Sequence, residues 1–202
     1  MRSYKKGAIQ YLSEEELKEF FCQIEKEIEQ RPSEILPKRN LAIFKTIFFH
    51  ALRSIELVRM KMSDFDFENN RIFIIGAKKG KQGREVLDPR IKKLILGYRQ
   101  LLKPENSQKD ILFISEKGGV LSTKAIWEAF QKYAILANLP AHKRHPHTLR
   151  HTFAMKCANK GKMKIEEVQA LLRHKSRKTT EVYFQILEER KLEFQEEVFG
   201  FL

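Results

Sequence analysis

The chain has 202 residues, which is long enough for one well-buried domain with a short appendage. It carries 39 lysine and arginine residues against 26 aspartate and glutamate residues, a formal net charge of +13. A basic excess spread along the whole chain favours nucleic acid over a small metabolite as the partner, although ribosomal and membrane-surface proteins share this balance. We expect a soluble, cytoplasmic protein, because the sequence has no apolar run of about 18 residues and no signal-type apolar core.

The first fifty residues show helical periodicity after a basic tail at residues 1–12. Residues 13–16 form a capping box, and apolar residues at helical spacing follow it. This pattern predicts a helix that ends before Arg31. A loop containing Pro37 then leads to a second predicted helix at about residues 39–50.

Arg53 is the first candidate functional residue. It follows the apolar residues 47–49 closely and lies near the start of a short predicted helix that ends at about Met60. Arginine is rarely buried unless its charge is paired, so an arginine flanked by core residues is a candidate for a binding or catalytic role. The alternative is a structural ion pair with Glu56.

The hydrophobic period changes from helix to strand after residue 70. Residues 71–75 and 84–87 have strand-like sequences and predict an antiparallel hairpin. The turn between them carries three lysines, Lys78, Lys79 and Lys81. Lysines at a hairpin tip are usually only solvated, but such a tip can also bring ammonium groups to a DNA groove or phosphate.

Two further helices are predicted after the hairpin. Asp88 is an N-cap residue before a proline and opens a helix to about Leu102. Residues 122–123 cap another helix, which ends before Pro140 and in which we expect Trp127 to lie in the core. The chain shows no internal repeat, low-complexity tract or second domain. These elements predict an α+β fold that is mostly helical, with a small sheet.

The predicted helix at residues 146–161 carries the densest group of candidate residues. His147, Arg150 and His151 are three and four residues apart and therefore share one face near the start of this helix. A guanidinium beside imidazoles, near the positive end of a helix dipole, is suited to bind an anion. The alternative is a solvated basic helix end.

The last part of the chain adds two candidates. His174 follows a short predicted helix at residues 165–172, and Tyr183 lies nine residues later in the final helix. The alternative for Tyr183 is a packed aromatic residue. Beyond it, an apolar stripe at helical spacing needs a surface that buries it. The members of this stripe are Leu187, Phe194, Val198 and Phe201.

Taken in order, six positions resemble the active-site set of the tyrosine recombinases, the phage integrase family. The six are Arg53, a hairpin lysine, His147, Arg150, His174 and Tyr183. The motifs that carry the resemblance are Ala51–Leu57, Lys78–Lys81, His147–His151, and Leu172–His174 with the segment that leads to Tyr183. The resemblance covers about residues 13–190. It implies a helical catalytic domain with a small antiparallel sheet at residues 13–186. It also implies a tail helix at residues 187–202 that docks on a neighbouring subunit.

The activity that the resemblance implies is site-specific recombination through a 3′-phosphotyrosyl intermediate, in integration, excision or inversion. Tyr183 would be the nucleophile, since a phenol with a pKa of about 10 is also a good leaving group. Arg53 and Arg150 would stabilise the charge on the phosphorus with forked donors. No metal or other cofactor is required, because the phosphotyrosine bond conserves the energy for rejoining.

The resemblance assigns proton transfer to the remaining members of the set. His147 and His174 would act as proton carriers and hydrogen-bond donors around the phosphate. A hairpin lysine would protonate the departing 5′ oxygen. We place Lys78 first in this role because it lies at the strand end, although Lys79 and Lys81 compete for it.

Other polar residues are expected to support the site or to contact DNA. The expected DNA contacts are Lys79, Lys81, Arg84, Arg173 and Arg177, and the expected supporting residues are His151 and Glu56. Two positions depart from the family pattern, because Ala51 and Arg173 each replace a usual glycine. The change at Arg173 adds bulk and charge directly beside His174.

The expected partner is double-stranded DNA with specific inverted-repeat sites, bound by a homotetramer that is a monomer when free; no membrane is expected. In the monomer we expect a folded-back or mobile tail, with Tyr183 away from the arginines. One alternative is a type IB topoisomerase, which uses a similar residue set, and another is a DNA-binding module that has lost catalysis. A zinc site at His145, His147 and His151 is disfavoured, since no carboxylate or cysteine lies at ligand spacing.

Overall fold

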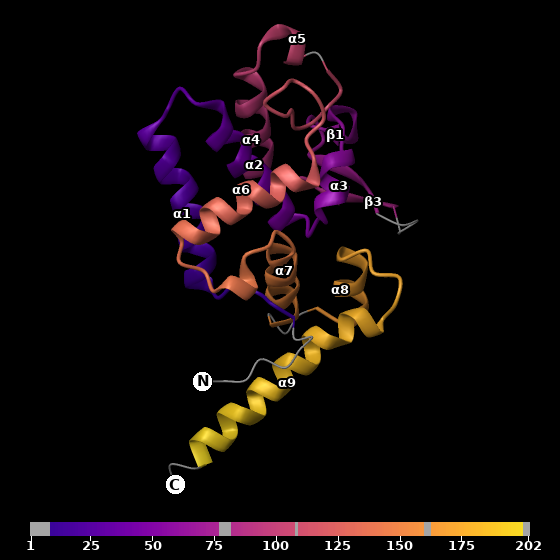
Figure 1. The fold of residues 1–202 in the computed structure, drawn as a ribbon. Coiled ribbons are helices and arrows are strands. Elements are labelled where there is room, and N and C mark those ends of the chain that lie inside the picture. Colours follow the sequence, from indigo (N-terminus) through magenta and orange to yellow (C-terminus); the bar gives the residue numbers. More distant parts are fainter. Residues whose placement is uncertain (1–8, 77–81, 108, 160–162, 200–202) are drawn as a thin grey trace.

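The structure, a computed structural model, describes residues 9–76, 82–107, 109–159 and 163–199. Its longer elements, in chain order, are α1 (Glu14–Gln30), α2 (Ile35–Phe49), α3 (Ser54–Arg59), β1 (Phe65–Asp66), β2 (Arg71–Ile75), β3 (Gln82–Val86), α4 (Pro89–Gln100), α5 (Pro104–Ser107), α6 (Thr123–Leu136), α7 (His147–Asn159), α8 (Ile165–Leu171) and α9 (Lys178–Phe199). Figure 1 shows α7 and α8 between the group formed by α1, α2, α4 and α6 and the long helix α9. The prediction of a mostly helical α+β fold with a small antiparallel sheet is confirmed.

The main core contains an aromatic cluster between α1, α2 and α6. Phe20, Phe44 and Phe130 are fully buried. The ring of Phe20 lies 4.6 Å from that of Phe130 and 5.5 Å from that of Phe44, measured between centroids. At these separations tilted and edge-on rings attract one another beyond the burial of their surface. The predicted helix after the capping box is confirmed, since Ser13 caps α1 with both reciprocal hydrogen bonds in place.

The sheet has three antiparallel strands in the order β1–β2–β3. The predicted hairpin is confirmed in β2 and β3, where Phe73 pairs with Arg84. Ile72 and Ile74 are buried on the face of β2 that meets the core, while Ile75 is exposed. Strand β1 was not predicted, because a strand of two residues is too short for an alternating pattern.

Two details of the helices differ from the sequence prediction. Helix α2 begins at Ile35, so Pro37 lies in its first turn, where the missing N–H costs nothing. The prediction that Trp127 lies in the core is wrong, because this residue is 48% exposed. The buried face of α6 contains Ile126 and Phe130, and one residue beyond Ile126 the helix has turned by about 100° towards solvent.

A second, smaller core joins the N-terminal segment to α7, α8 and α9. Ile9 and Tyr11 pack partly buried against it. Leu12, which is 3% exposed, belongs to the main core, and its backbone N–H donates to the hydroxyl of Thr152 over 2.8 Å. Residues 9–12 therefore pack against the domain, and residues 1–8 of the predicted basic tail lie outside the described residues. Helix α9 is continuous through residue 187, and Leu187 packs partly buried against this core. Further along α9, which extends away from the other helices in Figure 1, Leu192 is 58% exposed.

Within the described ranges, no helix has both the length and the apolar character needed to cross a membrane.

We predict that Phe130→Ala lowers the free energy of unfolding by about 3–5 kcal/mol, because it opens a cavity in the aromatic cluster. The matched control is Trp127→Ala on the exposed face of the same helix, which should change stability by about 0.5 kcal/mol or less. Urea denaturation of both variants measures the difference. Equal losses would contradict the assignment of the buried face of α6.

Candidate active site

Five of the six expected catalytic residues lie on elements that meet around α7. Arg53 is the N-cap of α3, while His147 and Arg150 lie in the first turns of α7. His174 lies between α8 and α9, and Tyr183 lies in α9. Because α7 packs against α2, α8 and α9, these side chains converge although they are far apart in sequence. The candidate lysines Lys78, Lys79 and Lys81 lie outside the described residues.

The carboxylate of Glu56 links three guanidinium groups. Arg53 binds it twice, through its backbone N–H and through Nη1, each over 2.8 Å. Arg150 and Arg173 place a terminal nitrogen 3.6 Å and 3.7 Å from Oε2 of the same carboxylate. The ion pair of Arg53 with Glu56, the structural alternative from the sequence, therefore exists within the candidate site. Since Glu56 is 2% exposed, it neutralises these cations more strongly than a solvated carboxylate would.

Arg150 is fully buried and is held by the backbone. Its two terminal nitrogens donate to the carbonyl oxygens of Ala51 and Leu172. Each terminal nitrogen carries two hydrogens, so each keeps a second N–H for another acceptor. Burial, followed by the charge of Arg53, lowers the pKa of Arg150 to about 9, and the group remains a cation at neutral pH.

Tyr183 lies inside the site with its hydroxyl hydrogen-bonded to a histidine. The residue is 1% exposed, and its oxygen lies 2.8 Å from Nδ1 of His151. Burial raises the pKa of Tyr183 to about 12, against the opposing effect of Arg150 and Arg53. These charges act on the phenol, so the prediction that Tyr183 lies away from the arginines in a monomer is wrong. The hydrogen bond agrees with the expectation that His151 supports the site, and its role in catalysis stays a prediction.

The three histidines of the site are neutral at neutral pH. Burial, followed by the charges of Arg150 and Arg53, lowers the pKa of His147 and of His174 to about 4. Burial, followed by the neighbouring His147, lowers the pKa of His151 to about 3. Nδ1 of His174 lies 3.0 Å from the hydroxyl oxygen of Thr180. The ring of His174 is nearly parallel to that of Tyr183, with an interplanar angle of 9°. A neutral imidazole has one unprotonated nitrogen, so His151 can accept the proton of the Tyr183 hydroxyl.

His147 and Arg53 are accessible to solvent, and we refer to this pair as the mouth of the site. His147 is exposed at the start of α7, and the side chain of Arg53 is 31% exposed. Both lie beside the buried cation Arg150, whose charge lowers the pKa of His147. An anion that enters here would offset these cations and raise the pKa of His147.

The expected DNA contacts have different surroundings. Arg84 is exposed on β3. Arg177 is exposed and pairs with Glu166 over 2.6 Å and with Glu181 over 3.0 Å. The DNA roles of both arginines stay predictions. Arg173, in contrast, is 4% exposed and bonded to internal groups, so a direct phosphate contact does not fit this structure.

Three polar residues near the site were not identified from the sequence. Glu85 binds Arg173 through one carboxylate oxygen, and the other lies 3.3 Å from Nδ1 of His50. Thr180 contacts His174, although the sequence suggested only a helix start there. The one sequence signal for Glu85 was the replacement of a usual glycine by Arg173, because a charged side chain at a crowded position needs a charged partner.

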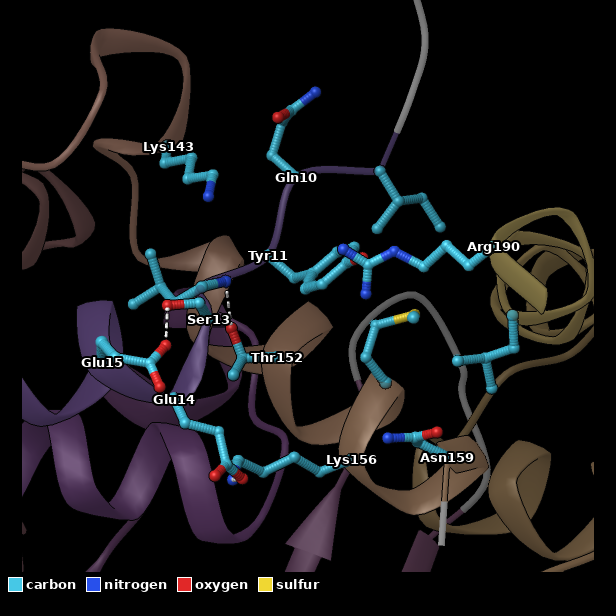
Figure 2. A pocket seen from close by; sticks show the side chains of 14 residues that line it. Gln10, Tyr11, Ser13, Glu14, Glu15, Lys143, Thr152, Lys156, Asn159 and Arg190 are labelled. Carbon is cyan, nitrogen blue, oxygen red and sulfur yellow. Dashed lines mark hydrogen bonds and ion pairs between the residues drawn. The ribbon is translucent and has the colours of Figure 1, made fainter. Parts of the chain in front are cut away.

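A groove behind the site couples the N-terminal segment to the helix that carries the tyrosine. Figure 2 shows Tyr11 and Arg190 facing each other across this groove, with the guanidinium of Arg190 5.2 Å from the ring centroid. Thr152 and Lys156 of α7 line its floor. The contact of Arg190 with Tyr11 therefore joins α9 to the N-terminal segment.

No three His, Cys, Asp or Glu side chains among the described residues gather in a way that would hold a metal ion.

The sequence of this chain is similar to those of known proteins. The model of the phage integrase family matches residues 10–190. The chain belongs to this family. It is similar to tyrosine recombinase XerC of Oceanobacillus iheyensis, with 32% identity over 154 residues that cover 73% of this chain and 49% of the relative. It is also 32% identical over 162 residues to tyrosine recombinase XerA of Thermococcus onnurineus, covering 79% of this chain and 55% of the relative.

Solved structures of the family have the same fold. XerH site-specific recombinase, bound to its palindromic difH substrate in a post-cleavage complex, matches with a TM-score of 0.76 and 29% identity. The match covers 93% of this chain and 53% of that one. The crystal structure of XerA recombinase matches with a TM-score of 0.72 at 24% identity, which supports the fold alone. This phage integrase family chain spans about half the length of the curated relatives that it matches.

The depressed histidine pKa values predict that acid destabilises the free protein. His147, His151 and His174 have a pKa of about 3 to 4 when folded, against about 6.5 in an unfolded chain. Below about pH 6.5 the unfolded chain therefore binds more protons, and the free energy of unfolding falls as the pH falls towards 4. Urea denaturation between about pH 7 and pH 5 measures this slope. His151→Asn should make the slope shallower, and parallel curves for wild type and variant would contradict the assignment.

Proposed function

We propose that this chain is the catalytic domain of a site-specific recombinase that cleaves and rejoins double-stranded DNA through a 3′-phosphotyrosyl bond. The observation that carries the proposal is the buried hydroxyl of Tyr183, bonded to His151 beside Arg150. A buried tyrosine hydroxyl needs a hydrogen-bond partner in any fold, but an imidazole that can accept its proton, beside two guanidinium groups, suits a nucleophile. Membership in the phage integrase family and similarity to named tyrosine recombinases support the same activity.

The reaction proposed here begins with a DNA phosphate at the mouth formed by Arg53 and His147. The phenol of Tyr183 loses its proton, for which neutral His151 is the nearest acceptor, and the oxygen attacks phosphorus. The bond from phosphorus to the 5′ oxygen breaks, and that oxygen takes a proton from a general acid, the role that we assign to Lys78. The 5′ hydroxyl of another strand then attacks phosphorus and gives its proton to the deprotonated lysine. The bond from phosphorus to the Tyr183 oxygen breaks, and the phenol takes back its proton from His151.

Positive charge around the phosphorus is the main contribution of the site. The remaining N–H groups of Arg150 and the accessible guanidinium of Arg53 can donate to the non-bridging oxygens. Arg150 and Tyr183 are buried in the free protein, so side chains at the mouth must move before a phosphate touches them. DNA binding would cause this movement, and its phosphate would supply the negative charge that the cationic site lacks.

Two alternatives use parts of the same arrangement. A type IB topoisomerase would relax supercoiled DNA without paired sites, and a silent DNA-binding module would form no covalent product. The named similarity to site-specific recombinases favours recombination over the first. Five converging candidate catalytic residues favour an enzyme over the second.

The proposed assembly is a homotetramer on inverted-repeat DNA sites in the cytoplasm, formed from monomers. Support comes from the palindromic substrate named for XerH, to which this chain is similar. The far part of α9 also supports it, because Leu192 is 58% exposed on a helix that extends away from the domain. An exposed apolar residue at that place can be buried by a neighbouring subunit.

We predict that Tyr183→Phe abolishes the covalent adduct while DNA binding persists, because only the nucleophilic oxygen is lost. The substrate is a nicked duplex that carries a site selected from random DNA by binding, and the adduct appears as a slow band in a denaturing gel. The wild-type band should resist heat and detergent and disappear on protease treatment. An undiminished band with Phe at this position would overturn the nucleophile assignment.

We predict that Arg53→Lys slows adduct formation by about a hundredfold or more, since lysine keeps the charge but loses the forked donor. DNA affinity should change much less, because an exposed cation remains at the mouth. The matched control is Arg31→Lys, an exposed arginine at the end of α1 that pairs with Glu34. Single-turnover cleavage and a binding titration separate the two effects. A loss confined to affinity would make Arg53 a binding residue only.

A further inference from the structure

We propose that Arg173 is a positioning residue that holds the turn between α2 and α3, strand β3 and the loop of His174 in one fixed arrangement. This proposal rests on the proposed function for its effect on catalysis. The sequence suggested a DNA contact at this residue, but its guanidinium points into the protein. Its burial, backbone conformation and partners support the positioning role.

The guanidinium of Arg173 binds groups from three segments. Nη2 donates to the carbonyl oxygens of His50 and Ala51 over 2.8 Å and 3.0 Å. Nη1 binds the carboxylate of Glu85 on β3 and the carbonyl oxygen of Leu171, the latter over 3.0 Å. One planar group therefore connects the end of α2, the sheet and the end of α8.

The turn that Arg173 holds is the one that leads into Arg53. The carbonyl oxygen of Ala51 accepts hydrogen bonds from both Arg173 and Arg150. Arg150 also donates to the carbonyl oxygen of Leu172, the residue before Arg173. These bonds close a ring between the two guanidiniums and two backbone segments. A shift of Arg173 would therefore move the acceptors that orient Arg150 and the backbone that orients Arg53.

The backbone at this ring is in an unfavourable conformation. Arg173 has φ +52° and Ala51 has φ +45°, in the left-handed region that favours glycine. A residue with a Cβ atom is strained in this region relative to glycine. Burial of a guanidinium costs more unless it is paired. An arginine kept at this position despite both costs indicates that its hydrogen bonds matter to the site.

Glu85 gives Arg173 its own counterion. Its second carboxylate oxygen lies 3.3 Å from Nδ1 of His50, so it holds the end of α2 as well. Glu56 is 3.7 Å from Arg173 and is also the partner of Arg53. Without Glu85, the buried charge of Arg173 would draw on Glu56 and loosen the ion pair that orients Arg53. Arg173 and Glu85 should therefore act as a coupled pair.

The test compares four variants with wild type in single-turnover formation of the Tyr183 adduct and in DNA affinity. Arg173→Met keeps the volume and removes the guanidinium, and Arg173→Gly removes it while relieving the strain. Glu85→Gln and the double variant Arg173→Met/Glu85→Gln complete a double-mutant cycle. The matched control, Arg39→Met, removes another buried guanidinium, which binds the carbonyl oxygen of Ile114 at the far end of α2. Melting curves set a temperature at which every protein is folded.

We expect Arg173→Met and Arg173→Gly to slow cleavage by about tenfold to a hundredfold, with affinity within about threefold of wild type. The double variant should be no slower than Arg173→Met, because the pair acts as a unit. If Arg173→Met does not fold, Arg173→Gly carries the test alone. An equal loss of rate in Arg39→Met, or multiplied effects in the double variant, would overturn the positioning role.

Hydrogen exchange of the free protein tests the positioning role of Arg173, which we call the clamp, separately from the proposed function. Arg173→Gly should speed exchange in peptides that cover residues 50–53 and 83–86, whereas Arg39→Met should leave these peptides at the wild-type rate. Unchanged exchange in Arg173→Gly would overturn the clamp. If Arg173→Gly speeds exchange but the wild-type protein forms no adduct, the proposed function is contradicted and the positioning role of Arg173 remains supported.

Discussion

The carboxylate of Glu56 is the contact on which the arrangement of the candidate site depends. It caps α3 through the backbone of Arg53, binds the guanidinium of Arg53 and lies within 4 Å of Arg150 and Arg173. Three buried or half-buried cations could not lie side by side without an anion among them. Because Glu56 and Glu85 together do not neutralise three guanidinium groups, the site keeps a positive charge that suits the phosphate of the proposed reaction.

Helix α7 gives this electrostatic arrangement a rigid frame. One side of the helix enters the main core, where Leu149 is fully buried, and the other enters the smaller core through Ala154 and Met155. Tyr183 belongs to that smaller core, so its hydroxyl is fixed against α7 by apolar packing as well as by His151. The packing that stabilises the C-terminal part of the domain is therefore also the packing that positions Tyr183, the proposed nucleophile.

In the proposed mechanism, burial explains how a site rich in ionisable groups stays inactive without DNA. It keeps the Tyr183 phenol protonated and the histidines neutral, while Arg150 remains charged and satisfied by backbone carbonyls. Each of these states changes when a phosphate enters, because an anion favours protonated histidines and competes for the arginine N–H groups. The free protein thus has the proton donors and acceptors in place, and the substrate supplies the charge that activates them.

The sequence by itself determined most helices, the hairpin, the family and the order of the candidate residues, because capping boxes, helical spacing and short motifs are local. It could not determine which face of α6 is buried, since Trp127 and Ile126 are equally apolar neighbours. The sequence also could not determine the direction of the Arg173 side chain, because a basic residue beside His174 suggested a DNA contact. Only the fold brought Glu85 of β3 and the carbonyl oxygen of Ala51 to its guanidinium. The hydrogen bond between Tyr183 of α9 and His151 of α7 likewise joins two residues that are 32 positions apart in the sequence. Such contacts depend on how whole helices pack, and no local pattern in the chain encodes them.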